Sequence, residues 1–69
     1  MININVLGKR IAEIRHQRGL TQKQLAEKVG VTAQAVSKWE RGSNCPDIAI
    51  FDEVASALNV SVSELLGVN

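Results

Sequence analysis

The apolar positions of the chain recur at helical spacing in five short segments, which are separated by glycines and polar turns. In the first segment, Leu7, Ile11 and Ile14 follow the i, i+4, i+7 pattern that places side chains on one face of a helix. Gly19 marks the end of this helix, because glycine readily takes the left-handed conformation that follows a last turn. The pattern leaves little room for strands and predicts an all-α fold.

Capping residues indicate the second and third helices. Thr21 and Gln24 have the spacing of a capping box, in which the threonine hydroxyl and the glutamine side chain each bind a backbone N–H. We expect the second helix to end at Gly30. Thr32 can cap a third helix that continues to about Arg41.

Two further helices are predicted in the C-terminal part of the chain. Pro46 suits the first turn of a fourth helix, where its missing N–H costs nothing, and Asp47 beside it favours the helix dipole. The expected apolar face of this helix consists of Ile48, Phe51, Val54, Ala55 and Leu58. Ser61 and Glu64 form a second capping box, which opens a short fifth helix. Without a linker or repeat, residues 1–69 are predicted to form a single domain, a compact bundle of five short helices.

The charges are divided unequally along the chain, although the net charge is only +1. Residues 1–41 contain all eight basic and three of the seven acidic residues, a net charge of +5, and residues 42–69 have a net charge of −4. A basic surface can dock on phosphates while the acidic part stays away from the duplex. A chance division of charges on a globular domain is the alternative interpretation.

The composition excludes several classes of protein. With 45% hydrophobic and 22% charged residues, the chain is typical of a globular domain. It has no apolar run near the roughly 20 residues that cross a bilayer, and no signal peptide. The single cysteine, Cys45, provides neither a disulfide framework nor a metal-ligand pair, and favours the reducing cytoplasm. We expect no cofactor, no metal and no membrane partner.

Three side chains suggest a chemical role that their sequence context argues against. Trp39 resembles a stacking platform for an unpaired base, but its position beside Val36 predicts a core residue. His16 has no second ligand nearby in the sequence, which favours a solvated side chain over a metal ligand or a catalytic base. Cys45 has no cluster of basic neighbours that would make it a redox switch. The chain also has no paired catalytic carboxylates and no nucleophile with a base, so we do not expect an enzyme.

Residues 22–41 carry the strongest indication of function. Two short helices joined by a turn at residues 30–32 must cross steeply, which requires a small residue such as Ala26 where they meet. This arrangement fits a helix-turn-helix motif, whose second helix can enter the major groove of DNA.

The third helix has one apolar and one polar side when its residues are placed at about 100° intervals. Val36 and Trp39 lie on the apolar side. The other side holds Gln34, Ser37, Lys38 and Arg41, with Ala33 at its edge. These small, polar or basic side chains are the types that contact base edges. An ordinary solvated helix face is the alternative interpretation for each of them.

The same stretch resembles the phage-repressor and Cro class of helix-turn-helix proteins, also called the xenobiotic-response-element family. The resemblance covers about residues 7–67 and implies a bacterial or phage transcription regulator with a lambda-repressor-like fold. It is carried by Leu20-Thr21-Gln22, Leu25-Ala26, Val29-Gly30-Val31, Val36-Ser37-Lys38-Trp39-Glu40-Arg41-Gly42, Pro46-Asp47 and Val60-Ser61-Val62-Ser63-Glu64-Leu65-Leu66.

The resemblance also implies roles for particular residues. Gln22 corresponds to a glutamine that grips a phosphate and braces the recognition helix, and Arg15 and Glu40 to a pair that bridges the first and third helices. A half-buried Glu40 would need such a partner. The implied base-reading residues are Thr32, Ala33, Gln34, Ser37 and Lys38. Contacts with the DNA backbone are expected from Gln22, Arg15, Lys23, Arg41 and Asn44. Ala33 is small where several relatives carry a long polar side chain, which places more of the readout on Gln34 and Lys38.

Two functions follow as hypotheses. The first is sequence-specific binding of double-stranded DNA as a repressor-type regulator, by a homodimer on a palindrome with half-sites roughly 34 Å apart. Relatives often continue into a C-terminal sensor or oligomerisation domain, where an effector would bind. Candidate dimer contacts are Ile2, Ile4, Val60, Val62, Leu66 and Val68. The alternative is a protein-interaction module of the antitoxin or antirepressor type, which the modest net charge keeps open.

Overall fold

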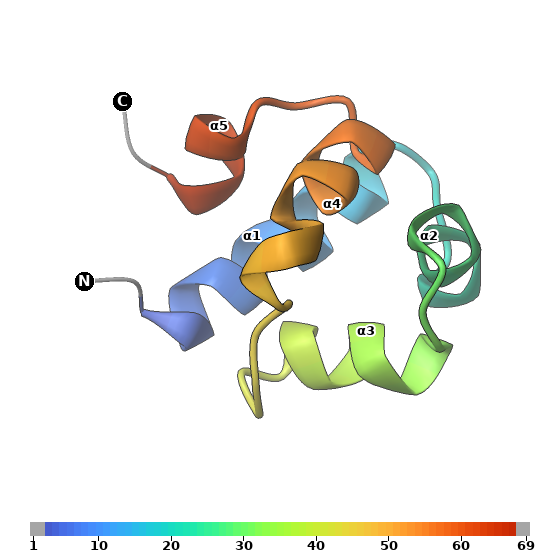
Figure 1. The fold of residues 1–69 in the computed structure, drawn as a ribbon, viewed down its shortest axis with the longest axis horizontal. Helices are drawn as coiled ribbons and strands as arrows, with labels where there is room; N and C mark the ends of the chain where they lie inside the picture. Colours follow the sequence, from blue (N-terminus) through green and yellow to red (C-terminus); the bar gives the residue numbers. More distant parts are fainter. Residues whose placement is uncertain (1–2, 68–69) are drawn as a thin grey trace.

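The computed structural model describes residues 3–67, and every regular element in that range is helical (Figure 1). The elements are α1 (Ile4–Gln17), α2 (Gln22–Val29), α3 (Ala33–Glu40), the 3-10 helix η1 (Ile48–Ile50), α4 (Phe51–Ala57) and α5 (Val62–Leu66). The predicted all-α fold with five α-helices is confirmed. Within residues 3–67, no helix has both the length and the apolar character needed to span a membrane.

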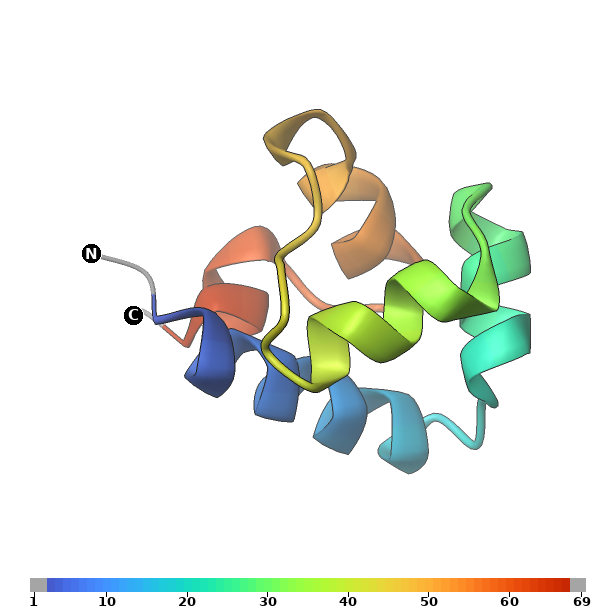
Figure 2. The same ribbon diagram turned by 90° about the horizontal axis from the view of Figure 1, so that it is seen from below.

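The helices pack so that α3 lies along one edge of the molecule. α1 contacts α3 and α5, while α2 contacts α3 and α4. The beginning of α1 and the end of α5 lie on the same side of the domain (Figures 1 and 2). In Figure 2, α3 lies between α1 and α4 in the view, and no other helix lies in front of it.

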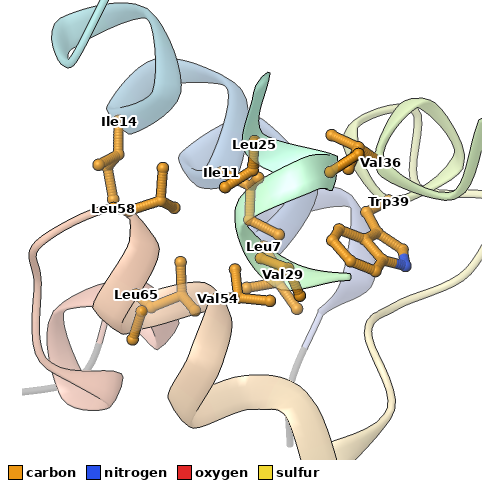
Figure 3. Packing of buried hydrophobic residues seen from close by; sticks show 12 residues of the cluster. Leu7, Ile11, Ile14, Leu25, Val29, Val36, Trp39, Val54, Leu58 and Leu65 are labelled. Atoms are coloured by element: carbon orange, nitrogen blue, oxygen red, sulfur yellow. The ribbon is translucent and has the colours of Figure 1, made fainter. Parts of the chain in front are cut away.

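All five α-helices border a single apolar core (Figure 3). Its buried members are Leu7, Ile11, Ile14, Leu25, Ala26, Val29, Val36, Trp39, Val54, Ala55, Leu58 and Leu65. Trp39 is only 5% exposed, which confirms its prediction as a core residue. Burial of large aliphatic side chains supplies about 1.5–3 kcal/mol each, so a domain this small depends on every helix contributing.

The predicted caps are present with normal hydrogen-bond geometry. In the first capping box, Gln24 N donates to Thr21 Oγ1 at 3.0 Å and Thr21 N donates to Gln24 Oε1 at 2.8 Å. The box formed by Ser61 and Glu64 has both corresponding distances at 3.0 Å. These local interactions define where α2 and α5 begin, in agreement with the sequence pattern.

The prediction for the start of the fourth helix is wrong. Pro46 lies in the loop before η1 with its side chain fully buried, and Asp47 caps η1 by accepting from Ala49 N at 3.5 Å. Ile48, expected on the apolar face, is 84% exposed. A 3-10 helix turns about 120° per residue, and the backbone at Ile50 (φ −113°, ψ 5°) interrupts the helix. The apolar spacing of α4 therefore cannot be extended back to Ile48.

Arg10 of α1 and Arg18, the residue that caps the end of α1, bind the carboxyl-terminal ends of other helices. Arg18 Nε donates to Leu58 O at 2.8 Å, at the end of α4. Arg10 Nε donates to Glu64 O at 3.1 Å and to Leu65 O at 3.3 Å, in α5. Cations are favourable at helix C-termini because the last carbonyl groups lack backbone partners. These two positive charges therefore have structural partners that the charge distribution did not suggest.

Replacing a core leucine should cost far more stability than replacing the exposed isoleucine. Leu25→Ala removes a fully buried side chain in α2 and should lower the free energy of unfolding by about 2–5 kcal/mol. Ile48→Ala, the matched control, should change it by less than about 0.5 kcal/mol. Urea denaturation followed by Trp39 fluorescence measures both values. Equal losses for the two variants would contradict the position of the core.

The capping box of α5 should make part of the stability pH-dependent. The Ser61 backbone N–H lowers the pKa of Glu64, and the Ser61 hydroxyl and the charges of Arg18 and Arg10 act in the same direction. Because the folded pKa is the lower one, this contribution is present above the unfolded pKa and disappears as the pH falls through the folded pKa.

An NMR titration of the Glu64 carboxyl tests this directly. Its midpoint should lie below that of the same residue in the urea-unfolded chain. Ser61→Ala removes the hydroxyl but keeps the backbone N–H, so it should raise the folded midpoint only part of the way. Identical midpoints in the folded and unfolded chains would show that the box does not stabilise the charged form.

Candidate DNA interface

α2 and α3 are joined by a tight turn at residues 30–32. Gly30 takes the left-handed conformation (φ 84°), and its N–H donates to Ala26 O at 2.8 Å. Val31 N donates to the same oxygen at 3.0 Å, and Thr32 caps α3 by accepting from Ala35 N at 3.1 Å. Ala26 is 2% exposed, and its small side chain lets the two helices approach where they cross.

The two sides of α3 differ as the sequence predicts. Val36 and Trp39 are buried in the core. The predicted base-reading residues gather on the outer side, where Thr32, Ala33, Gln34 and Lys38 are exposed and Ser37 is partly buried. No acidic side chain lies among them. Their contacts with bases remain a prediction.

A Schellman motif closes the carboxyl-terminal end of α3. Gly42 has φ +76°, Ser43 N donates to Lys38 O at 2.9 Å, and Gly42 N donates to Trp39 O at 3.1 Å. The chain then turns into the loop that carries the exposed Asn44 and Cys45. A defined helix end places this loop immediately beside the outer side of α3.

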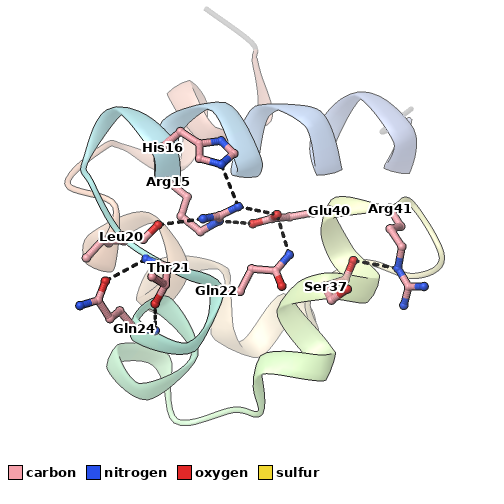
Figure 4. Close-up of polar contacts among 9 residues, drawn as sticks. All are labelled: Arg15, His16, Leu20, Thr21, Gln22, Gln24, Ser37, Glu40 and Arg41. Carbon is pink, nitrogen blue, oxygen red and sulfur yellow. Dashed lines mark hydrogen bonds and ion pairs between the residues drawn. The ribbon is translucent and has the colours of Figure 1, made fainter.

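The carboxylate of Glu40 connects three helices (Figure 4). Arg15 in α1 forms the predicted ion pair with it, through Nε to Oε2 at 2.6 Å and Nη2 to Oε1 at 3.0 Å. Gln22 in α2 donates from Nε2 to Glu40 Oε1 at 3.0 Å. Arg15 Nη1 also donates to Leu20 O at 2.8 Å, in the turn before α2. The interaction ties the last turn of α3 to both other helices.

This network changes what can be expected of Arg15. The Arg15 and Glu40 side chains are only 9% and 8% exposed, and Arg15 Nη2 also lies 3.3 Å from His16 Nε2. The phosphate contact of Arg15 remains a prediction, and it would have to compete with these partners within the domain. Gln22 braces α3 as the resemblance implies, while its phosphate contact remains a prediction.

The other predicted backbone contacts lie on the surface. Lys23, Arg41 and Asn44 are exposed, and Arg41 Nε donates to Ser37 O at 3.3 Å. Lys23 follows Gln22, which contacts Glu40 in the last turn of α3, and the other two residues follow α3 directly. Their contacts with phosphate remain predictions as well.

Gly8 is absent from the residues predicted above. It is buried in α1, and a Cβ at this position would lie 3.0 Å from Glu40 O. Its position could have been noticed in the sequence, because an isolated glycine inside a helical pattern often marks a close packing contact.

Four of the six candidate dimer contacts lie within the described residues. Ile4, Val60, Val62 and Leu66 are partly buried, whereas Ile2 and Val68 lie outside the described residues. His16 and Cys45 are exposed, and residues 3–67 contain no group of three or more His, Cys, Asp or Glu side chains placed to hold a metal ion.

Two crossed helices joined by a tight turn, with a polar outer side on the second, define a helix-turn-helix protein. Residues 11–65 match the family model described as Helix-turn-helix, and the chain belongs to this family.

Curated relatives share most of this chain. The uncharacterized HTH-type transcriptional regulator YazB of Bacillus subtilis (strain 168) is 35% identical over 60 residues, 87% of each chain. The immunity repressor protein of Bacillus phage phi105 is 39% identical over 61 residues, which are 88% of this chain and 42% of the repressor. The chain therefore spans less than half the length of the phage protein.

Solved structures of similar fold include complexes with DNA. The P22 c2 repressor with a synthetic operator has a TM-score of 0.84 and 32% identity, covering 91% of this chain and 96% of that one. SinR, a master regulator for biofilm formation, in complex with DNA has a TM-score of 0.80 and 38% identity, covering 87% and 97%. A complex of SinR with SinI protein has the same score and identity, covering 87% of this chain and 59% of that one.

Removing the charge of Glu40 should destabilise the domain. Glu40→Gln leaves the buried Arg15 guanidinium without its counter-charge and should lower the free energy of unfolding by about 3 kcal/mol. Glu27→Gln removes an exposed carboxylate of α2 and should cost less than about 0.5 kcal/mol. Urea denaturation compares the two, and a loss for Glu40→Gln no greater than that of its control would refute the bridging role.

Proposed function

We propose that this chain binds duplex DNA by placing α3 in the major groove, as a dimer on an inverted repeat. Sequence-specific DNA binding in transcription regulation is the function that its family and the DNA-bound neighbours support. The observation that carries the proposal is the outer side of α3, which is exposed, free of acids and backed by the buried Val36 and Trp39.

The side chains on that outer side suit particular base edges. Gln34 can bind adenine through two hydrogen bonds, and Lys38 can donate to the acceptors of guanine. Ser37 can bind either kind of edge, and the methyl groups of Ala33 and Thr32 can contact a thymine methyl. In this arrangement Gln34 and Lys38 supply most of the discrimination.

Neutral and basic groups of both helices of the motif would hold the DNA backbone. Gln22 and Lys23 begin α2, where Gln22 contacts the last turn of α3, and Arg41 and Asn44 follow α3. Phosphate contacts of this kind fix the register of a protein on the duplex without reading the sequence.

A second copy is needed because one recognition helix reads only about four to six base pairs. The domain measures 28 × 23 × 22 Å, so two copies side by side can place their α3 helices about 34 Å apart, one turn of DNA. The partly buried apolar side chains of Ile4, Val60, Val62 and Leu66 are the candidate contacts between the copies.

The salt dependence of binding should be moderate. Arg10, Arg15 and Arg18 are engaged within the domain, which leaves Lys23, Lys38 and Arg41 as the basic groups near the proposed DNA. Because Lys38 is assigned to a base, Lys23 and Arg41 remain for phosphate, and a dimer with about four such contacts predicts a slope of about −4 for log K against log salt concentration.

A protein-interaction module is the second candidate, and the SinR–SinI complex supports it because that neighbour also binds a protein. Binding to a protein through the same fold would show little salt dependence, since few counterions are released. A sensor domain or a protein partner would supply regulation, as the greater length of the phi105 repressor suggests. Because the proposed ligand is DNA, we propose that the protein acts in the cytoplasm.

Substitutions in α3 should change base preference without unfolding the domain. From random duplexes, the parent should select an inverted repeat, and Gln34→Ala and Lys38→Ala should each lose about 1–3 kcal/mol of discrimination at one base pair per half-site. Lys28→Ala, which removes an exposed lysine of α2, is the control and should keep the preference.

Selection at low and moderate salt followed by sequencing gives the base preferences, and circular dichroism reports the helix content. Retained preference in both α3 variants would show that another surface reads the DNA. No enrichment at either salt would favour the interaction module.

A further inference from the structure

Gly8 lies where α1 meets the last turn of α3. A Cβ on this residue would overlap the carbonyl oxygen of Trp39 and would lie 3.0 Å from that of Glu40. Only a hydrogen atom fits between the two backbones. Glycine weakens a helix interior relative to alanine, so the close approach gives a structural reason for glycine at this position.

Two further contacts fix the same end of α3 from the same helix. Asn5, one turn before Gly8, packs against Gly42, whose Cβ, if present, would lie 3.3 Å from Asn5 Cα. Arg15, two turns after Gly8, holds the Glu40 carboxylate. Asn5 lies three residues before Gly8 and Arg15 seven residues after it, so all three residues are on one side of α1.

The turn before α3 is fixed by α2, which also binds the last turn of α3 through Gln22 and Glu40. Gly30 and Val31 both donate to Ala26 O, which ties the turn before α3 to α2. No contact of α1 with this turn is needed to hold it, so a change at the α1 contact would move the last turn of α3 more than the first. At 1.5 Å per residue, Lys38 lies about 7.5 Å beyond Ala33, and Gln34 only about 1.5 Å.

We propose that Gly8 is a positioning residue for base readout. It sets the distance between α1 and the last turn of α3, and thereby the depth at which Lys38 and Ser37 enter the major groove. This inference rests on the proposed function. Gly8 itself touches no base or phosphate in this arrangement, and its effect passes through the backbone at Trp39 and Glu40.

The substitution Gly8→Ala tests the proposal on the full chain. Binding of duplexes that carry single base-pair changes is measured by fluorescence anisotropy. The preference at the base pair assigned to Lys38 should fall by about tenfold, and the preference at the base pair assigned to Gln34 should change by less than about twofold. A role in stability alone would weaken binding to all duplexes equally.

Ala12→Gly is the matched control. It lies one turn further along α1 and weakens the helix by the reverse exchange, without adding volume against α3. Both base preferences should persist in this variant. Loss of the Lys38 preference in Ala12→Gly would mean that a change in the helix propensity of α1 in either direction, not the close contact, controls readout.

A second measurement needs no DNA. Backbone amide shifts in nitrogen-15 NMR spectra should change more at residues 38–43 than at residues 33–35 when Gly8 becomes alanine. If Gly8→Ala does not fold, Asn5→Ala, which removes the neighbouring contact with Gly42, should give the same pattern with smaller changes. Evenly spread shifts would overturn the proposal.

The base preference of the unsubstituted protein distinguishes a failure of the proposed function from a failure of the positioning role of Gly8. A parent without base preference overturns the proposed function, and with it the role of Gly8. A parent with base preference whose Gly8→Ala variant keeps both preferences overturns the positioning role alone.

Discussion

The carboxylate of Glu40 joins α1, α2 and α3, and the orientation of the recognition helix depends on it. A buried charge must be balanced, and here Arg15 supplies the opposite charge while Gln22 supplies a further hydrogen bond. The paired hydrogen bonds between the guanidinium and the carboxylate also restrict direction, which an apolar contact would not do. The polar outer side of α3 therefore has a fixed relation to the rest of the domain.

Features encoded by neighbouring residues could be predicted from the sequence. The capping boxes at Thr21 and Ser61 involve residues three apart, and the apolar sides of α1 and α3 follow helical spacing. The start of the fourth helix was mispredicted, because a change from 3-10 to α geometry near Ile50 alters the direction of the side chains without a change in composition.

Contacts between distant segments were harder to predict. The partners of Arg10 and Arg18 are backbone carbonyl groups, which every residue possesses, so no side-chain pattern marks them. The close approach at Gly8 likewise depends on a helix more than 30 residues away in the sequence. The ion pair of Arg15 and Glu40 was predictable only through the family resemblance and the need of a half-buried carboxylate for a partner. The outer side of α3 followed from helical periodicity, but the bases it contacts depend on a complex with DNA.

The sequence distance between Arg10 or Arg18 and its carbonyl partners also affects when the domain can form during synthesis. Their carbonyl partners lie 40–55 residues later in the chain, in or just after the last two helices. On a ribosome, residues 22–41 emerge well before those helices, without Leu58 and Leu65 to complete the core. A nascent chain of that length contains both helices of the motif and the Arg15–Glu40 pair that orients α3, but it lacks the side chains of α4 and α5 that close the core beneath them.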